Sequence, residues 1–159
     1  MDTFLGIDPG LATVGFGVIR ADKRQVIPVT HGVIRTEKGS TAGERLHQIK
    51  EDLNTLIAKY KPCAVGVESL FFATNTKTAL RVAEARGVIV ETIFSHHLPI
   101  IEMTPLQIKN GVCGDGGADK SQVQRMVQML LKLPKPPAPD DAADALAIAI
   151  YTSRVFKFL

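Results

Sequence analysis

Four carboxylates in three separate segments are the side chains of this sequence best suited to chemistry. Asp8 and Glu68 each end a short apolar run, and Asp141 and Asp144 open an alanine-rich segment near the C-terminus. A carboxylate that ends a buried strand is costly unless another group pairs with it. Because the acids come from separate segments, the pattern indicates one shared charge partner, a divalent metal ion.

Each of these acids also has a purely structural interpretation. Asp8 precedes a Pro-Gly pair and could cap a turn, a role for which Glu68 is less suited. Asp141 and Asp144 could stabilise a helix N-terminus, where we expect Asp140 to be the N-cap. Residues three apart share one helix face, however, and the apolar residues that follow turn that face toward the protein interior. Acids at such a buried edge need neutralisation, which favours the metal interpretation.

The ligand types indicate Mg²⁺ or Mn²⁺. Carboxylate and water oxygens suit these ions, whereas structural Zn²⁺ favours cysteine or histidine. His96 and His97 are adjacent, so they cannot face the same way on a helix, and we expect them at its C-terminal end or on the surface. Carboxylates that converge from two strands and a helix have the layout of a two-metal phosphodiester hydrolase.

The elements that must position these acids alternate in type along the chain. The first third of the sequence is typical of three strands joined by short turns, which implies antiparallel pairing. Farther on, helical spacing of apolar residues alternates with short apolar runs. We predict strands at residues 3–8, 13–20, 25–36, 63–68 and 99–103, and helices at 42–60, 75–95, 105–112, 120–131 and 140–151. This order predicts an α/β fold, a mixed sheet with helices on its faces.

The helix predicted at residues 75–95 is unusual because apolar residues occupy most of its circumference. A helix that is apolar all round is expected to be buried all round. In a chain this small, a second subunit could cover one of its faces. This helix is therefore the candidate interface of a homodimer.

Bulk properties exclude several classes of protein. A chain of 159 residues is expected to form a single domain with a sizeable core. No run approaches the roughly 20 apolar residues of a membrane span, and the N-terminus has no signal-peptide pattern. We therefore expect a cytoplasmic protein without a membrane partner. The net charge of +3 permits a nucleic-acid partner without requiring one.

Five short motifs resemble one known family when they are taken together. They are Gly6-Ile7-Asp8-Pro9-Gly10, Val67-Glu68 followed by Phe71-Phe72, Ala85-Arg86-Gly87, Lys120-Ser121-Gln122-Val123 and Asp141-Ala142-Ala143-Asp144-Ala145-Leu146-Ala147. In order and spacing they resemble RuvC, the bacterial endonucleases that resolve Holliday junctions, over about residues 3–152. The resemblance implies an RNase H-like fold, with three antiparallel strands and then parallel ones in a five-stranded sheet covered by helices on both faces. It also implies a homodimer that hydrolyses two opposing strands of four-way junction DNA in recombination and repair.

The resemblance further implies a catalytic role for the four acids. Asp8, Glu68, Asp141 and Asp144 match the metal-binding residues of the family, which are expected to hold two Mg²⁺ ions, with Mn²⁺ as a substitute. Asp8 is expected to bridge the two ions from a central strand. The branch-migration proteins RuvA and RuvB are the protein partners that the family implies.

Four further side chains match family positions or adjoin them. Lys109 and Lys120 match lysines that the family places near the scissile phosphate, and Phe71 matches an aromatic residue that stacks on a base. Phe72 doubles this aromatic residue, so which ring stacks stays open. Both rings could instead belong to the core. Their position between an acid-ended strand and polar residues favours a loop that reaches unstacked bases.

Basic residues are expected to contact the DNA backbone. Lys77, Arg81 and Arg86 fall on or near the helix at 75–95 and join Lys109 and Lys120 as predicted DNA contacts. The alternative for each is a solvated surface charge.

Three rival functions remain. The first motif also resembles the phosphate loop of actin-like ATPases and sugar kinases, but those proteins need two such domains, and no Walker-type motif is present. A non-catalytic module that recognises branched DNA would not need the complete set of acids. Another RNase H-like nuclease that acts on branched nucleic acid differs from a junction resolvase only through the family match.

Overall fold

The computed structural model describes residues 1–69 and 76–158. Its strands are β1 (Asp2–Asp8), β2 (Thr13–Ala21), β3 (Val26–Arg35), β4 (Ala64–Glu68) and β5 (Ile100–Met103). Its helices are α1 (Ala42–Tyr60), α2 (Thr76–Ser95), α3 (Pro105–Cys113), α4 (Lys120–Leu130), α5 (Asp140–Val155) and the 3₁₀ turn η1 (Phe156–Phe158). All of the predicted strands and helices are present, and none of the described helices is long and apolar enough to cross a membrane.

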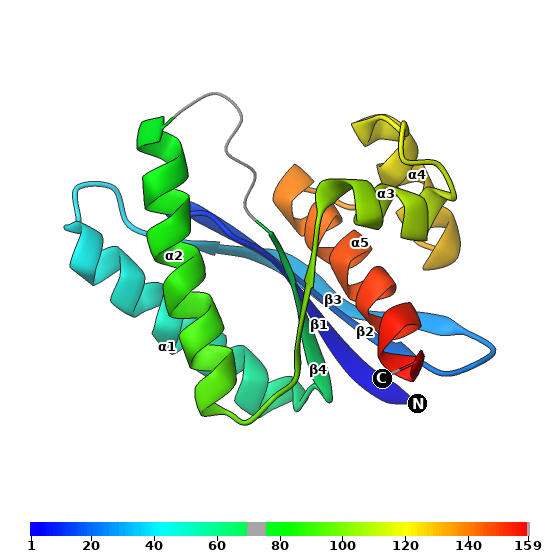
Figure 1. The fold of residues 1–159 in the computed structure, drawn as a ribbon, viewed down its shortest axis with the longest axis horizontal. Coiled ribbons are helices and arrows are strands. Elements are labelled where there is room, and N and C mark those ends of the chain that lie inside the picture. The colour runs from blue at the N-terminus through cyan, green and yellow to red at the C-terminus, as the bar shows by residue number, and fades with distance from the viewer. Residues whose placement is uncertain (70–75, 159) are drawn as a thin grey trace.

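The strands form one mixed sheet in the order β3-β2-β1-β4-β5 (Figure 1). β2 pairs antiparallel with β1 and β3, whereas β4 runs parallel to β1 and β5. The predicted fold class is therefore confirmed. β1 is the central strand, and its carboxyl end meets that of its parallel neighbour β4 at one edge of the sheet. Asp8 and Glu68 are the last residues of these two strands.

Alternation along β1 and β4 directs both acids to the same face of the sheet. Leu5 and Ile7 belong to the hydrophobic cluster under α1 and α2, whereas Phe4 belongs to the cluster under α3, α4 and α5 (Figure 1). Because successive strand residues face opposite sides, Asp8 lies on the same face as Phe4. β4 repeats the pattern, so Glu68 also lies on the α5 face.

A row of glycines lets α5 lie unusually close to the sheet. Gly17, Gly6 and Gly66 are in register across β2, β1 and β4. A Cβ atom at Gly6 would overlap the backbone oxygen of Ala145, and one at Gly66 would overlap the hydroxyl of Thr152. Both of these groups belong to α5, so the helix packs directly over the row of glycines. Close contact of this kind needs residues without a side chain.

α5 begins at Asp140, as predicted, but its N-cap is a different residue from the predicted one. Pro139 is the N-cap, because its carbonyl accepts hydrogen bonds from the backbone of Ala142 at 3.0 Å. The prediction of Asp140 as N-cap is therefore wrong. The Asp140 carboxylate instead accepts a hydrogen bond from Gln124 and pairs with Lys120, both on α4. These contacts join the start of α5 to the start of α4.

The prediction that α2 is buried all round is wrong for the single chain. Ala85, Ile89 and Ile93 are fully buried, but Leu80 is 63% exposed and Phe94 is 73% exposed. The reason is that α2 packs one face against α1 and the sheet and leaves the other uncovered (Figure 1). The exposed face carries large apolar side chains, as a docking surface would.

Candidate active site

Asp8 and Glu68 form the centre of the acidic site at the carboxyl edge of β1 and β4. A hydrogen bond joins their two carboxyl groups. Two carboxyls can share such a bond only if one of them keeps its proton. Asp8 is the protonated member, because burial, and then the nearby charges of Glu68, Asp144 and Asp141, raise its pKa to about 8.

α5 brings the other two acids to this pair. Carboxylate oxygens of Asp8, Asp141 and Asp144 all lie within 4.8 Å of one another. Gly15, which faces Asp8 across the β1–β2 pairing, lies directly against the backbone carbonyl of Asp141. The absence of a side chain at this glycine therefore allows the first turn of α5 to approach β1. Glu68 joins the group through its hydrogen bond with Asp8.

The cluster holds more negative charge than its surroundings can stabilise. Burial is the largest cause that raises the pKa of Glu68 and of Asp144, and neighbouring carboxylates add to it. Lys120 acts against this increase by pairing with Asp144 at 3.6 Å. Lys109 also attracts Glu68, but two lysines cannot neutralise four acids. A bound cation would release the retained protons and stabilise the carboxylates.

The donor set fits a hard divalent cation. The group that lies within 4.8 Å consists only of carboxylates, from Asp8, Asp141 and Asp144. Carboxylate oxygens suit Mg²⁺ and Mn²⁺, and a cluster with raised pKa values gains most from a dication. The arrangement can therefore hold metal at the end of the central strand, beside an open surface.

Two lysines border the acids across a small cavity. The cavity has a volume of about 250 Å³, and its lining includes Glu68, Asp144, Lys109 and Lys120. Burial alone would lower the pKa of Lys120, but Asp144 and Asp140 outweigh burial and raise it. Lys120 therefore stays charged. Lys109 attracts the Glu68 carboxylate.

A second, basic hollow adjoins the loop between β1 and β2. Its lining includes Lys77 and Arg81 from the start of α2, Arg45 from α1, Leu11 from the loop and Thr13 from the start of β2. Lys77 and Arg81, two of the three predicted DNA contacts on α2, are exposed there. Sequence reasoning missed Arg45, because a lone arginine in the first turns of a helix is typical of a solvated surface. Only the fold brings Arg45 to the other cations.

The remaining predicted DNA contacts differ in their surroundings. Arg86 lies away from the basic hollow and is partly buried, with its guanidinium donating to the Glu68 backbone carbonyl and paired with Glu102. Phe71 and Phe72 lie outside the described residues.

Comparisons with known proteins agree with this fold and site. The family model for crossover junction endodeoxyribonuclease RuvC matches residues 4–152. A crossover junction endodeoxyribonuclease RuvC of Alkaliphilus oremlandii is 51% identical over 154 residues, which cover 97% of this chain and 94% of the relative. The RuvC of Natranaerobius thermophilus is 46% identical over 153 residues, covering 96% and 95%.

A solved structure shares the same architecture. The Thermus thermophilus RuvC in complex with a Holliday junction substrate has a TM-score of 0.94 and 30% sequence identity, covering 99% of this chain and 96% of that one. The sheet with its covering helices is thus an RNase H-like fold, and the resemblance seen in the motifs is confirmed. The chain belongs to the RuvC family of crossover junction endodeoxyribonucleases.

Proposed function

We propose that this protein is a structure-specific endodeoxyribonuclease that resolves Holliday junctions by metal-dependent phosphodiester hydrolysis. The observation that carries the proposal is the convergence of carboxylates from β1 and α5 within 4.8 Å, joined by Glu68 from β4. Membership of the RuvC family supports a Holliday junction as the substrate, since a relative of known structure is described in complex with one.

The four acids are proposed to hold Mg²⁺, with Mn²⁺ as a substitute and two ions as the expected number. Asp8, at the end of the central strand, would hold metal together with the other acids. The chemistry that metal would supply in such a site is activation of the attacking water and stabilisation of the leaving oxygen. For its part, the protein must release the proton that Asp8 shares with Glu68 before both carboxylates can act as ligands.

The basic residues are proposed to hold the DNA backbone on both sides of the acids. Lys109 and Lys120 border the catalytic cavity, where they can face the phosphate that is cleaved. Lys77 and Arg81, with Arg45 beside them, would contact phosphates farther along the strand. Phe71 remains the proposed stacking residue on the grounds of the family motif alone.

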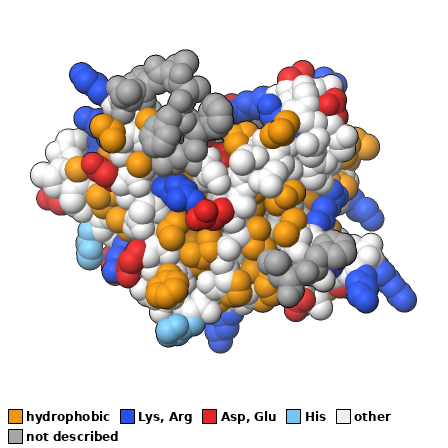
Figure 2. All heavy atoms as spheres, in the orientation of Figure 1, with side chains coloured by type: hydrophobic (Ala, Val, Ile, Leu, Met, Phe, Trp, Pro, Cys, Tyr) orange, Lys and Arg blue, Asp and Glu red, His pale blue; other side chains and the backbone are white. Residues whose placement is uncertain are grey.

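A homodimer is the proposed assembly, because resolution requires two symmetric cuts and a C2 dimer supplies two sites. The uncovered face of α2, with Leu80 and Phe94, is the proposed interface. Hydrophobic side chains gather over α2 and across the middle of the molecule between α2 and α5 (Figure 2). The family resemblance extends the proposal to action in the cytoplasm together with RuvA and RuvB.

Cleavage of a synthetic four-way junction tests the proposed function. With Mg²⁺ present, we expect paired nicks at symmetric positions in opposing strands of the junction. A linear duplex with the sequence of the same arms should remain uncut, because it lacks the branch. Junction binding without cleavage would instead favour a non-catalytic module, and cleavage of both substrates at equal rates would exclude a structure-specific enzyme.

The pH dependence of stability should reveal the metal site without any DNA. The folded pKa of Asp8, about 8, lies above its ordinary value of 3.8, so the folded state binds the extra proton between about pH 4 and pH 8. Stability of the metal-free protein should therefore fall as pH rises through this window, by up to about 1.4 kcal/mol per pH unit. Burial shifts Glu68 and Asp144 in the same direction.

Thermal unfolding followed by circular dichroism measures this effect. Saturating Mg²⁺ should raise the melting temperature by about 5 °C or more, because about 100-fold saturation is worth about 2.7 kcal/mol. The increase should be larger at pH 8 than at pH 6, since fewer protons then compete with the metal. A Mg²⁺ effect that is equal at both pH values would argue against binding by these acids.

A further inference from the structure

Glu68 lies at the very end of β4, whereas Asp141 and Asp144 lie within a helix. Among the described residues, the contacts that hold the end of β4 are therefore those to neighbouring elements. On the β5 side, the amide of Ser69 donates to the carbonyl of Met103 at 2.7 Å. A metal ligand works only if neighbouring groups hold it in one orientation. Contacts that fix the backbone of Glu68 from other elements therefore bear on the metal site.

Arg86 supplies contacts of the required kind. It lies on α2, and its Nε donates to the backbone carbonyl of Glu68 at 3.3 Å. Its Nη2 pairs with Oε1 of Glu102 on β5 at 2.8 Å. The Arg86 side chain is only 20% exposed, which is low for an arginine that would be available to phosphates. One guanidinium thus joins α2, the end of β4 and β5.

The chemistry of arginine suits this bridging position. The guanidinium is rigid and planar, and its donors point in fixed directions, so it can hold a carbonyl and a carboxylate at once. Lysine presents one flexible charge and could satisfy only one of the two partners well. The Ala85-Arg86-Gly87 motif, which the sequence associates with DNA contact, therefore has a second interpretation in the fold.

We propose that Arg86 is a positioning residue that fixes the end of β4 and thereby orients the Glu68 carboxylate for metal binding. The proposal rests on the metal-dependent function proposed above. It differs from a DNA contact because Arg86 then acts on metal affinity in the absence of DNA. It differs from simple helix packing because its effect reaches the metal site.

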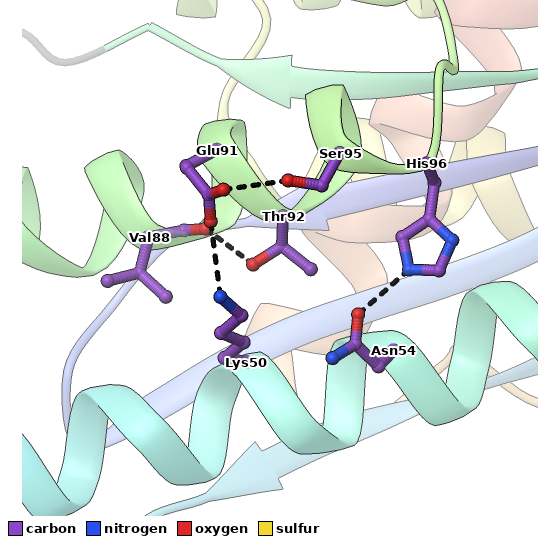
Figure 3. Close-up of polar contacts among 7 residues, drawn as sticks. All are labelled: Lys50, Asn54, Val88, Glu91, Thr92, Ser95 and His96. Carbon is purple, nitrogen blue, oxygen red and sulfur yellow. Dashed lines mark hydrogen bonds and ion pairs between the residues drawn. The ribbon is translucent and has the colours of Figure 1, made fainter.

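A second ion pair on the same helix provides the matched control. Lys50 on α1 pairs with Glu91 on α2 at 3.5 Å, and Glu91 also accepts a hydrogen bond from Ser95 (Figure 3). The side chains of Lys50 and Glu91 are 44% and 59% exposed. Lys50→Ala therefore removes a contact between α1 and α2 but no contact of Glu68.

Mn²⁺ titration of the DNA-free protein is the decisive measurement, with free Mn²⁺ detected by electron paramagnetic resonance. We expect Arg86→Ala to weaken Mn²⁺ binding about 10-fold or more, as is typical when a partner of a metal ligand is lost. Arg86→Lys should give an intermediate loss, and Lys50→Ala should match wild type. Glu102→Gln, which keeps the contact of Arg86 with Glu68, should weaken Mn²⁺ binding by about two- to threefold and serves if Arg86→Ala does not fold.

Junction binding without metal and the Mg²⁺ dependence of cleavage complete the experiment. For Arg86→Ala we expect unchanged junction affinity and a higher Mg²⁺ concentration for half-maximal cleavage. Weaker junction binding with normal Mn²⁺ affinity would overturn the proposal and assign Arg86 to DNA. Equal Mn²⁺ affinities in Arg86→Ala, Glu102→Gln and wild type would also overturn it. If wild type neither binds Mn²⁺ nor cuts the junction, the proposed function itself fails, an outcome distinct from the others.

Discussion

Asp8→Asn is expected to abolish junction cleavage and to leave junction binding intact or slightly tighter. Asp8 ends the central strand and lies within reach of the other acids, so its carboxylate is the one that every proposed arrangement of metal requires. Loss of a ligand worth several kcal/mol of transition-state stabilisation corresponds to a rate decrease of about 10³-fold or more. Binding should persist because the substitution removes a negative charge that would face phosphate.

The same variant should be more stable than wild type when no metal is present. Asparagine has nearly the shape of aspartate but carries no charge, so it removes both the burial of charge and the repulsion by nearby carboxylates that raise the pKa of Asp8 to about 8. The melting temperature of Asp8→Asn at pH 8 without metal should therefore exceed that of wild type. Mg²⁺ should then raise the melting temperature of the variant much less than that of wild type.

Asp22→Asn is the matched control for this substitution. Asp22 follows β2 at the opposite end of the sheet, where its carboxylate accepts hydrogen bonds from the amides of Arg24 and Gln25. The same chemical change there should leave cleavage unaltered. Single-turnover cleavage and gel-shift binding of one labelled junction compare all three proteins. Near wild-type cleavage by Asp8→Asn would remove Asp8 from the catalytic set.

Local sequence signals predict the elements of this fold well because most elements carry their own boundary signals. Thr41 with Glu44 forms a capping box at the start of α1, and Asp119 with Gln122 forms another at the start of α4. Period-two alternation in β1 and β4 also predicts that Asp8 and Glu68 share a face. α5 has no side-chain cap of this kind, and its start is where the predicted N-cap is wrong.

Contacts between distant segments are what the sequence leaves open. Arg86 is adjacent to Glu68 and Glu102 only after α2 has packed beside β4 and β5. Arg45 likewise lines the same hollow as Lys77 only through the packing of α1 beside α2. A pattern within one element cannot specify which other element covers it. The acids were predictable because their chemistry requires a shared partner, whereas an arginine is typical of many surfaces.

The glycines of the sheet also make contacts with a distant segment, α5, that the sequence alone does not predict. Gly15→Ala is expected both to destabilise the protein and to disrupt the acidic site. The added Cβ would overlap the backbone carbonyl of Asp141, and a backbone atom cannot move aside by changing rotamer. α5 must therefore shift away from β2, and Asp141 and Asp144 must shift with it. Overpacking of this kind costs about 2–4 kcal/mol.

Gly43→Ala is the matched control, the same substitution at a site that has room for the added Cβ atom. Gly43 lies in the first turn of α1, and the nearest atom to an added Cβ is the Thr41 hydroxyl at 4.0 Å. Alanine there should be neutral or should stabilise the protein by up to about 1 kcal/mol, since it favours helix more than glycine does.

Thermal melts, Mn²⁺ titration and junction cleavage of the two variants separate the effects. Gly15→Ala should melt about 5 °C or more below wild type, bind Mn²⁺ more weakly and cleave about 10²-fold more slowly, because small displacements of catalytic groups are that costly. Gly43→Ala should retain full metal affinity and cleavage. If Gly15→Ala behaved like Gly43→Ala, the close contact of α5 with β2 could not be what positions Asp141 and Asp144 beside Asp8.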